Sequence, residues 1–227
     1  MKCLVLFSGT GSVEFVFKEY GIECRGVDIN NKFKPYYNVD ILKWDYQKVI
    51  DEWEPDIIHS SFVCSEFSKL KSHLPRDLDK GYALLNRSLD IIEYAQSRNP
   101  EFKAVLENPV SPYVREHKRL NKLKRVEATY CKYGFWYKKP TYFWYTGFKL
   151  VLKKRCSKSN PCESILSNPN GNCHMVGLGY GGNGKIICHK YFKQLRKIPE
   201  YKGYTDREFR YRIPQLLLHD VVKCILD

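Results

Sequence analysis

The segment from Asp56 to Ser68 contains a residue that could act as a nucleophile. It starts as a short apolar run with β-strand character and then breaks into small polar residues, with Cys64 in the loop beyond. In α/β sheets, ligands and chemistry are found at the carboxyl ends of the strands. A cysteine held as a thiolate is the most nucleophilic side chain near neutral pH. The pattern predicts Cys64 as a nucleophile; the alternative is that it is an ordinary thiol among the nine cysteines of the chain.

A carboxylate follows another strand-like run. Phe102 to Leu106 is mainly apolar, and Glu107-Asn108-Pro109 comes directly after it. Because parallel strands end at the same edge of a sheet, Glu107 is expected on the edge that carries Cys64. A cysteine and a carboxylate at one site could combine nucleophilic attack with acid–base assistance.

The N-terminal segment has the order strand, glycine-rich turn, helix. Lys2 to Phe7 is continuous and apolar, Ser8 to Ser12 includes two glycines, and an apolar helix face follows. Glycines let the backbone approach a ligand closely, and the helix N-terminus offers free N–H groups. Asp28 ends the next strand-like run about 20 residues after the turn, where an acid can hold ribose hydroxyls. The alternative is a structural turn with a surface aspartate.

The remaining pattern alternates strands with helices. Asn38 to Ile41 is a third short strand-like piece that contains an acid, and Thr141 to Tyr145 indicates a later strand. Apolar residues recur at helical spacing between Arg76 and Ser97 and again from Ile213 to Leu226. This alternation predicts an α/β fold with a doubly wound, mostly parallel, Rossmann-like sheet.

The charge of the chain is unevenly distributed. Residues 1–110 carry 14 Lys and Arg against 17 Asp and Glu, whereas residues 111–227 carry 24 against 8, giving a net charge of +13 for 227 residues. A strongly basic half rich in Tyr and Phe favours a nucleic-acid contact surface over a merely solvated basic face. The run from Arg115 to Arg125 fits a DNA-backbone contact and a solvated helix face equally well.

The sequence has no segment that suggests a membrane or secreted protein. No apolar run reaches the roughly 18 residues of a membrane span, and the N-terminal run is too short for a signal peptide. We therefore expect an intracellular protein, in the cytoplasm or the nucleus. Its cysteines are then expected to be thiols or metal ligands rather than disulfides.

These motifs together resemble those of the DNA cytosine-C5 methyltransferases, in the same order and over nearly the whole chain. The segments that carry the resemblance are Phe7–Ser12, Asp28, Asp40, Val63-Cys64, Glu107–Pro109, Tyr133–Thr141 and Arg212–Leu216. The motifs Cys-x-Glu-Phe-Ser (64–68) and Glu-Asn-Pro (107–109) resemble those of the short family members found in phages and large DNA viruses. The resemblance implies a class I S-adenosylmethionine-dependent methyltransferase that acts, as a monomer, on double-stranded DNA.

The resemblance also implies roles for individual residues. Cys64 would attack carbon 6 of cytosine, Glu107 would hydrogen-bond ring N3 and the exocyclic amine, and Lys139 and Thr141 would support the base and the nucleophile loop. The implied S-adenosylmethionine-binding residues are Phe7, Ser8, Gly9, Thr10, Gly11, Ser12, Asp28, Ile29, Asp40 and Ile41. The target cytosine must be flipped out of the duplex or be unpaired already.

Several positions depart from the family pattern. Val63 replaces a proline that would fix the loop before the cysteine. Lys139 and Thr141 stand where the family has two arginines, which weakens the usual guanidinium support. A methyltransferase-fold protein that binds DNA with weak or no activity is therefore an alternative, and so is an RNA cytosine methyltransferase. The loop of the amino-methyltransferases is absent, since Asn108-Pro109-Val110 does not match it.

The sequence divides into a catalytic core (residues 1–146), a small, loop-rich basic target-recognition region (147–206) and a C-terminal helix that returns to the core (207–227). The basic region permits a structural zinc site built from Cys156, Cys162, Cys173 or His174, and Cys188 or His189. Their spacing matches no standard pair of zinc ligands. We therefore expect no metal, with zinc as the alternative. The glycine-rich stretch 177–184 is interpreted as a DNA-contacting loop, because no strand and helix frame it.

Overall fold

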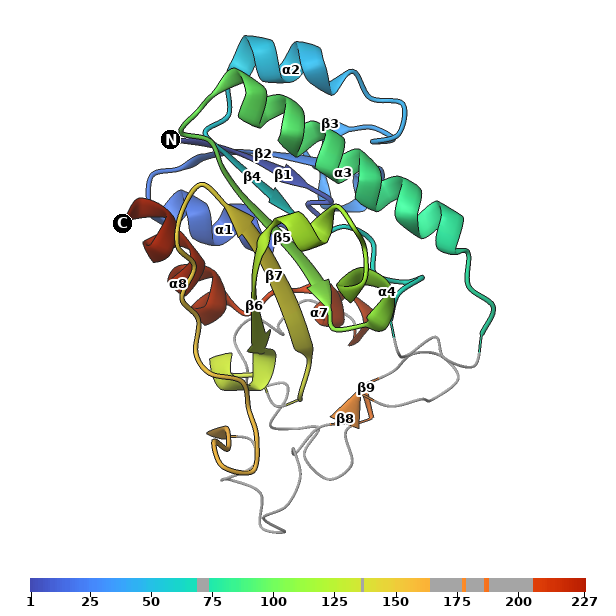
Figure 1. The fold of residues 1–227 in the computed structure, drawn as a ribbon, viewed down its shortest axis with the longest axis vertical. Coiled ribbons are helices and arrows are strands. Elements are labelled where there is room, and N and C mark those ends of the chain that lie inside the picture. The colour runs from blue at the N-terminus through green and yellow to red at the C-terminus, as the bar shows by residue number, and fades with distance from the viewer. Residues whose placement is uncertain (69–73, 136, 164–176, 179–185, 188–205) are drawn as a thin grey trace.

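A seven-stranded sheet lies at the centre of the protein (Figure 1). The structure, a computed structural model, describes residues 1–68, 74–135, 137–163, 177–178, 186–187 and 206–227. The sheet order is β3-β2-β1-β4-β5-β7-β6, with β7 antiparallel to both of its neighbours and β1 to β5 parallel. Its strands are β1 (Lys2–Leu6), β2 (Glu23–Asp28), β3 (Tyr37–Asn38), β4 (Ile57–Ser60), β5 (Lys103–Pro109), β6 (Lys124–Thr129) and β7 (Pro140–Thr146). The predicted doubly wound, mostly parallel sheet is confirmed.

Helices cover both faces of this sheet. The α-helices are α1 (Ser12–Glu19), α2 (Tyr46–Trp53), α3 (Leu78–Arg98), α4 (Pro112–Arg115), α7 (Asp206–Tyr211) and α8 (Gln215–Leu226). Short 3-10 turns are η1 (Asn31–Phe33), η3 (Leu120–Lys122) and η4 (Tyr130–Tyr133). Apart from the main sheet, β8 (Gly177–Leu178) pairs antiparallel with β9 (Ile186–Ile187).

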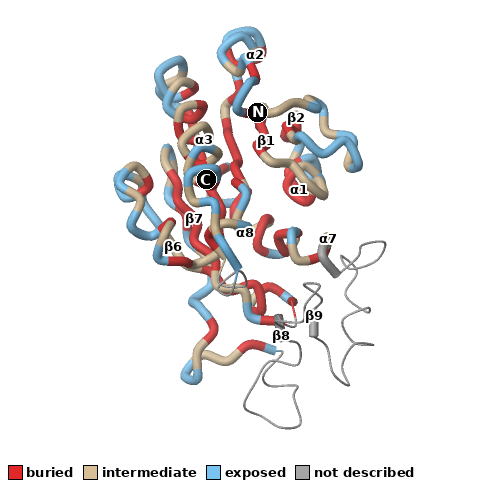
Figure 2. Tube along the Cα trace, turned by 90° about the vertical axis from the view of Figure 1, so that its right-hand side faces the viewer, coloured by how far each residue is buried: buried red, intermediate tan, exposed pale blue. Residues whose placement is uncertain are grey.

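The alternation of side chains along β1 divides the core into two layers. Cys3 and Val5 pack with α1 and α8, whereas Leu4 and Leu6 pack with α2 and α3 on the other face. Figure 2 shows the buried strands between helices that are exposed on their outer sides. Because both faces are covered, the central strands are continuous apolar runs rather than alternating ones.

Several elements differ from the sequence-based expectation. The third strand is Tyr37–Asn38 and ends before Asp40, and the helices α2 and α7 were not predicted. The basic run 115–125 is not one helix face, because it is divided among α4, η3 and the edge strand β6. Within that run, Arg119 pairs with Asp90 at 2.8 Å and with Glu93 at 3.0 Å on α3. This arginine is therefore already paired within the fold.

The first part of the predicted basic lobe packs on the core. The chain turns at Gly147 (φ +81°), where a Cβ atom would collide with the carbonyl oxygen of Phe102, and Leu150 is buried beyond it. Of the predicted zinc ligands, Cys156 and Cys162 are buried, whereas Cys173, His174, Cys188 and His189 lie outside the described residues. Most of the glycine-rich stretch 177–184 also lies outside them. Among the helices that the structure describes, none has the length and apolar character needed to cross a bilayer.

A buried histidine gives the fold a testable response to acid. His59 in β4 is fully buried, and neither ring nitrogen has a hydrogen-bond partner among the described residues. Burial lowers the pKa of His59 to about 3. The unfolded state, with a pKa near 6.5, binds a proton first, so the stability is complete above that pH and is lost as the pH falls toward 3.

We expect His59 to account for a loss of about 3 kcal/mol in the free energy of unfolding between pH 7 and pH 4. His59→Leu, which keeps the volume and removes the proton site, is expected to make the pH dependence shallower by that amount. Urea unfolding of both proteins at the two pH values measures the difference. Equal pH dependence in the two proteins would show that His59 is not the group that titrates.

Candidate active site

The glycine-rich turn after β1 forms one wall of the candidate site. Phe7 (φ +58°), Gly9 (φ +52°) and Gly11 (φ +70°) all have left-handed backbone conformations, which a non-glycine residue such as Phe7 adopts at an energetic cost. The amide of Gly11 donates to the carbonyl oxygen of Ser8 at 3.0 Å, and Gly11 then caps α1. The turn thus presents backbone at the carboxyl edge of the sheet.

The carboxylate of Asp28 connects this turn to the end of β2. One of its oxygens accepts the amide of Gly9 and the other accepts the amide of Asn30, both at 2.8 Å. Below the turn, the hydroxyl of Ser8 donates to the carboxylate of Glu14, and burial raises the pKa of Glu14. The acid at the end of β2 is therefore held by one amide of the glycine turn and by one amide of the segment that follows β2.

The loop that carries Cys64 is fixed by polar contacts in place of the missing proline. The side-chain amide of Asn108 donates to the carbonyl oxygen of Phe62 at 2.8 Å, and Phe62 is fully buried. Beyond the cysteine, the guanidinium of Arg76 donates to the carbonyl oxygens of Glu66 and Ser68 at 2.6 and 2.9 Å. These bonds hold the loop on both sides of Cys64, so Val63 needs no restricted φ angle.

Glu107 stands on β5 with its side chain nearly enclosed. Its carboxylate accepts a hydrogen bond from the Tyr130 hydroxyl at 2.8 Å, and the same oxygen lies 3.9 Å from Nζ of Lys139. The Lys139 ammonium also lies 4.5 Å from the centre of the Tyr130 ring. Burial, followed by the charge of Glu107, raises the pKa of Tyr130 well above its usual range, so Tyr130 is a neutral donor at physiological pH.

Tyr130 orients Glu107 in this arrangement, because its hydroxyl donates to that carboxylate. If Glu107 acts on the base as the family resemblance implies, we expect Tyr130→Phe to lower kcat about tenfold, the cost of losing one hydrogen bond to a charged group, and to leave KM for the implied cofactor unchanged. Steady-state kinetics measure both constants. Tyr133→Phe is the matched control: its buried hydroxyl accepts the amide of Lys153 at 2.7 Å and does not contact Glu107. An equal fall in kcat in both variants would indicate a merely structural role.

The charges around Cys64 act on its thiol in opposite directions. Burial raises the pKa of Cys64; Lys139 and, more weakly, Arg210 lower it, and Glu107 raises it. The net shift is upward, so most of the thiol is protonated at neutral pH. Lys139 thus supplies, at this site, a positive charge that favours the thiolate.

The glycine turn and the group around Cys64 line one cavity of about 560 Å³. It is lined by nine of the predicted residues: Phe7, Ser8, Gly9, Thr10, Ser12, Asp28, Cys64, Glu107 and Lys139. A second cavity of about 490 Å³ is lined by Ile29, Asp40 and Ile41 and shares Phe7, Asp28, Val63 and Ser65 with the first. The shared residues make the two cavities neighbours, and each is within the size range of a small-molecule site.

Two predicted residues line neither cavity. Gly11 forms the N-cap of α1. Thr141 is fully buried on β7, and its hydroxyl donates to the carbonyl oxygen of Lys139 at 3.2 Å. In this arrangement Thr141 supports the backbone of Lys139 from behind.

The contribution of α7 to the cavity was not predicted from the sequence. Glu208 and Tyr211 line the first cavity, and Nζ of Lys139 donates to the carbonyl oxygen of Arg210 at 3.2 Å. Glu208 also pairs with Lys32, which joins α7 to the segment after β2. The available signal was the charged stretch directly before Arg212-Ile-Pro, which the family resemblance assigns to the cofactor pocket.

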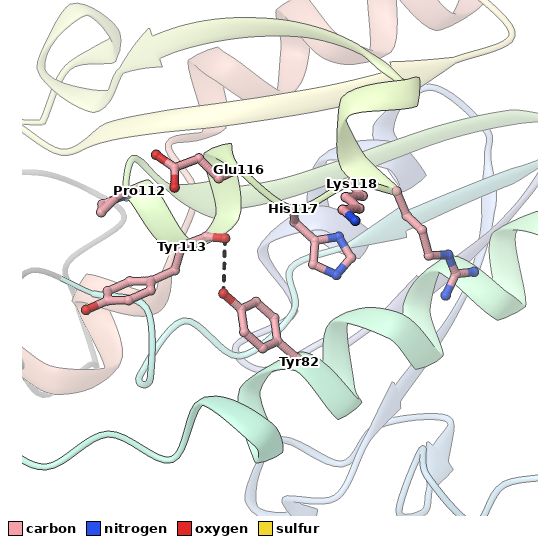
Figure 3. Close-up of a pocket in the computed structure, with 7 residues that line it drawn as sticks. Tyr82, Pro112, Tyr113, Glu116, His117 and Lys118 are labelled. Carbon is pink, nitrogen blue, oxygen red and sulfur yellow. Dashed lines mark hydrogen bonds between the residues drawn. The ribbon is translucent and has the colours of Figure 1, made fainter.

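Another cavity lies between α3 and α4 and shares no residue with the first (Figure 3). Its wall includes Tyr82, whose hydroxyl donates to the carbonyl oxygen of Tyr113 at 3.3 Å and whose ring stacks on His117. Among the described residues that line it there is no cysteine, and the one carboxylate, Glu116, lies 3.2 Å from the guanidinium of Arg115. The predicted site residues therefore line the first two cavities and not this one.

Comparison with solved structures shows the same fold in methyltransferases. The chain is similar to the methyltransferase EhMeth of Entamoeba histolytica, with a TM-score of 0.53 and 14% identity over 100% of this chain and 98% of that one. It is also similar to a mutant of DNMT2 from Spodoptera frugiperda, with a TM-score of 0.55 and 12% identity over 100% and 99% of the two chains. At these identities the likeness shows the fold. No family model matches the chain.

A sequence relative gives the family. The chain is 31% identical over 238 residues to a protein of Frog virus 3 (isolate Goorha) named "Probable DNA (cytosine-5)-methyltransferase", covering 98% of this chain and 99% of the relative. The chain belongs to the DNA (cytosine-5)-methyltransferase family. Membership of this family makes it a methyltransferase, whose methyl donor is S-adenosylmethionine, and the family that its motifs indicated is confirmed.

Proposed function

We propose that this protein transfers a methyl group from S-adenosylmethionine to carbon 5 of cytosine in DNA. The observation that carries the proposal is the shared cavity: the Gly9 turn and Asp28 line it together with Cys64, Glu107 and Lys139. A cofactor wall and a nucleophile with an acid and a cation thus face the same space. That is the set of groups that methylation at an unactivated ring carbon requires.

The residues of the two neighbouring cavities fit the cofactor. Gly9 brings no side chain to the turn, so backbone amides there can approach a ligand. The carboxylate of Asp28 can accept hydrogen bonds from ribose hydroxyls, and Asp40 lines the second cavity together with the apolar residues Ile29 and Ile41. When bound there, S-adenosylmethionine supplies an electrophilic methyl group on a sulfonium sulfur.

Cys64 is assigned the role of nucleophile. Carbon 5 of cytosine is a poor methyl acceptor until the ring is activated. Attack of the Cys64 thiolate on carbon 6 forms a carbon–sulfur bond and makes carbon 5 nucleophilic. After carbon 5 has accepted the methyl group, a base removes its proton, the carbon–sulfur bond breaks, and Cys64 is released. The positive charge of Lys139 favours the thiolate that starts this sequence.

Glu107 is assigned to the opposite side of the base. A hydrogen bond from its carboxyl group to ring N3 favours the N3-protonated ring, which accepts the electron density that the thiolate delivers. The Tyr130 hydroxyl holds one carboxylate oxygen of Glu107, which leaves the other oxygen for the base. The cytosine must leave the base stack to reach this enclosed site.

The replacement of the family's two arginines by Lys139 and Thr141 bears on whether the protein is active. The alternative of an inactive DNA-binding protein rested on Lys139 and Thr141 replacing arginines. The described geometry favours activity, because the Lys139 ammonium lies 3.9 Å from Glu107 and opposes the upward shift that burial gives the pKa of Cys64. Lys139 therefore supplies a positive charge to this site although the family's arginine is absent.

The test uses methyl-labelled S-adenosylmethionine with duplex DNA, single-stranded DNA and RNA of the same sequence. We expect label in DNA, released as 5-methyl-2′-deoxycytidine after digestion to nucleosides. Label in RNA alone would support the RNA alternative, and label on an exocyclic amine would contradict the assigned chemistry. Binding of DNA and cofactor without label would support the inactive alternative.

A further inference from the structure

Three buried cysteines gather at a site that the proposed reaction does not use. Cys131 lies in η4, and Cys156 and Cys162 lie in the segment that follows β7. Their sulfur atoms all lie within 4.8 Å of one another, and each residue is only 2% exposed. They form a small core cluster of their own, separate from the two large ones beside the sheet.

Backbone contacts bring the three residues together. Ser157 and Asn160 exchange backbone hydrogen bonds at 3.1 and 3.2 Å, so the chain doubles back between Cys156 and Cys162. The amide of Cys156 donates to the Thr129 hydroxyl at 2.8 Å, which places this turn against the end of β6 and hence beside Cys131. The cluster is therefore held by the main chain on both sides.

A side-chain contact adds to this support. Nζ of Lys132, the residue after Cys131, donates to the side-chain oxygen of Asn160 at 3.1 Å and to the carbonyl oxygen of Pro161 at 2.9 Å. Asn160 in turn donates to the carbonyl oxygens of Lys154 and Arg155, both at 3.2 Å. Lys132 thus holds the turn between Cys156 and Cys162 to η4.

We propose that Cys131, Cys156 and Cys162 are three ligands of a structural zinc ion. Tetrahedral zinc with bonds of about 2.3 Å to sulfur needs sulfur atoms roughly 3.8 Å apart, so the observed spacing closes around the ion with side-chain movements of under about 1 Å. Three thiolates and one Zn²⁺ leave a net charge of −1. One coordination position is left for a water molecule or a further ligand.

A disulfide explains the arrangement less well. It would pair two of the three sulfurs and leave the third buried beside it. Zinc uses all three, and thiolates are the ligands that it prefers in structural sites. The sequence spacing Cys-x5-Cys could not indicate this site, because the third ligand comes from Cys131, 25 residues before Cys156.

The site would connect the start of the basic region to the catalytic core. Cys131 directly follows Tyr130, whose hydroxyl holds Glu107, so a metal bound at η4 would fix the segment on which that tyrosine stands. This consequence rests on the proposed function, whereas the presence of the metal does not. Metal content and methyl transfer are therefore measured separately.

The test measures zinc in the full chain, purified without chelator, by inductively coupled plasma mass spectrometry. We expect one zinc per chain in the wild type, and less than about a fifth of that in Cys131→Ser, Cys156→Ser and Cys162→Ser. Cys24→Ser, which alters a partly buried cysteine on β2 outside the cluster, is the matched control and is expected to keep its zinc. Wild-type protein without zinc, or equal zinc in all four variants, would overturn the proposal.

A second measurement covers the case in which the serine variants fail to fold. Wild-type protein prepared with cobalt in place of zinc is expected to show the sulfur-to-cobalt charge-transfer absorption and the visible bands of tetrahedral coordination. Chelation is expected to remove these bands and to lower the Tm by several degrees. Wild-type protein whose cobalt spectrum lacks the thiolate band would contradict three cysteine ligands, whatever the methyl-transfer assay gives.

Discussion

Alanine in place of Cys64 is expected to lower the rate of methyl transfer by about 10³-fold or more, because the ring of cytosine is not activated without the covalent bond to carbon 6. The Gly9 turn and Asp28 are unchanged in this variant, so cofactor binding is expected to persist. Transfer of label from S-adenosylmethionine to DNA measures the first effect, and calorimetric titration with the cofactor measures the second.

A covalent trap gives the same prediction a direct readout. DNA that contains 5-fluorocytosine cannot lose the substituent at carbon 5, so the carbon–sulfur bond should persist and the complex should survive denaturation. Cys24→Ala, a change of the same kind on β2, is expected to form the trapped complex as the wild type does. A trapped complex with Cys64→Ala would show that another group is the nucleophile, and retention of more than about a tenth of the activity would lead to the same conclusion.

Much of this site could be read from the sequence because its residues follow strands. The apolar run before Glu107 predicted a strand that ends at Leu106, whereas β5 continues to Pro109. The predicted edge was still correct, because Leu106 pairs with Ser60 at the end of β4 and Cys64 comes in the loop after β4. The same reasoning places Asp28 at the end of β2. For these three residues, the position just after an apolar strand-like run was enough to predict that they lie at the carboxyl edge of the sheet.

Other parts depend on packing that spacing does not encode. Helix α7 reaches the cavity because Phe209 stacks on Phe135 with ring centres 4.7 Å apart, a contact between segments about 70 residues apart in the chain. Strand β6 begins at the end of the run 115–125, whose lysines and arginines fitted a DNA-backbone contact and a solvated helix face equally well. As the edge strand of the sheet it carries exposed basic residues at Lys124 and Arg125, which keep such an edge soluble. The local sequence pattern cannot show that α7 packs on the core, nor that Lys124 and Arg125 stand on an edge strand.

Glutamine in place of Glu107 is expected to have opposite effects on the nucleophile and on the reaction. The charge of Glu107 raises the pKa of Cys64, so its removal should lower that pKa and speed alkylation of Cys64 by iodoacetamide a few-fold at pH 7. Methyl transfer should nevertheless fall about 10²- to 10⁴-fold, because the ring loses its acid at N3. Peptide mass spectrometry measures the alkylation, and the label assay measures the transfer.

Two companion variants separate this effect from damage to the fold. Lys139→Gln removes the charge that lowers the pKa of Cys64, so alkylation should become slower at neutral pH and should need a higher pH to reach its maximum. Glu127→Gln on β6, a carboxylate 3.8 Å from Arg155 and outside both cavities, should change neither alkylation nor transfer. If Glu107→Gln and Lys139→Gln shifted the alkylation profile in the same direction, the two side chains would not act on Cys64 through their charges. Opposite shifts with loss of transfer in Glu107→Gln would mean that a more reactive thiolate alone does not suffice, and that the carboxyl group acts on the base.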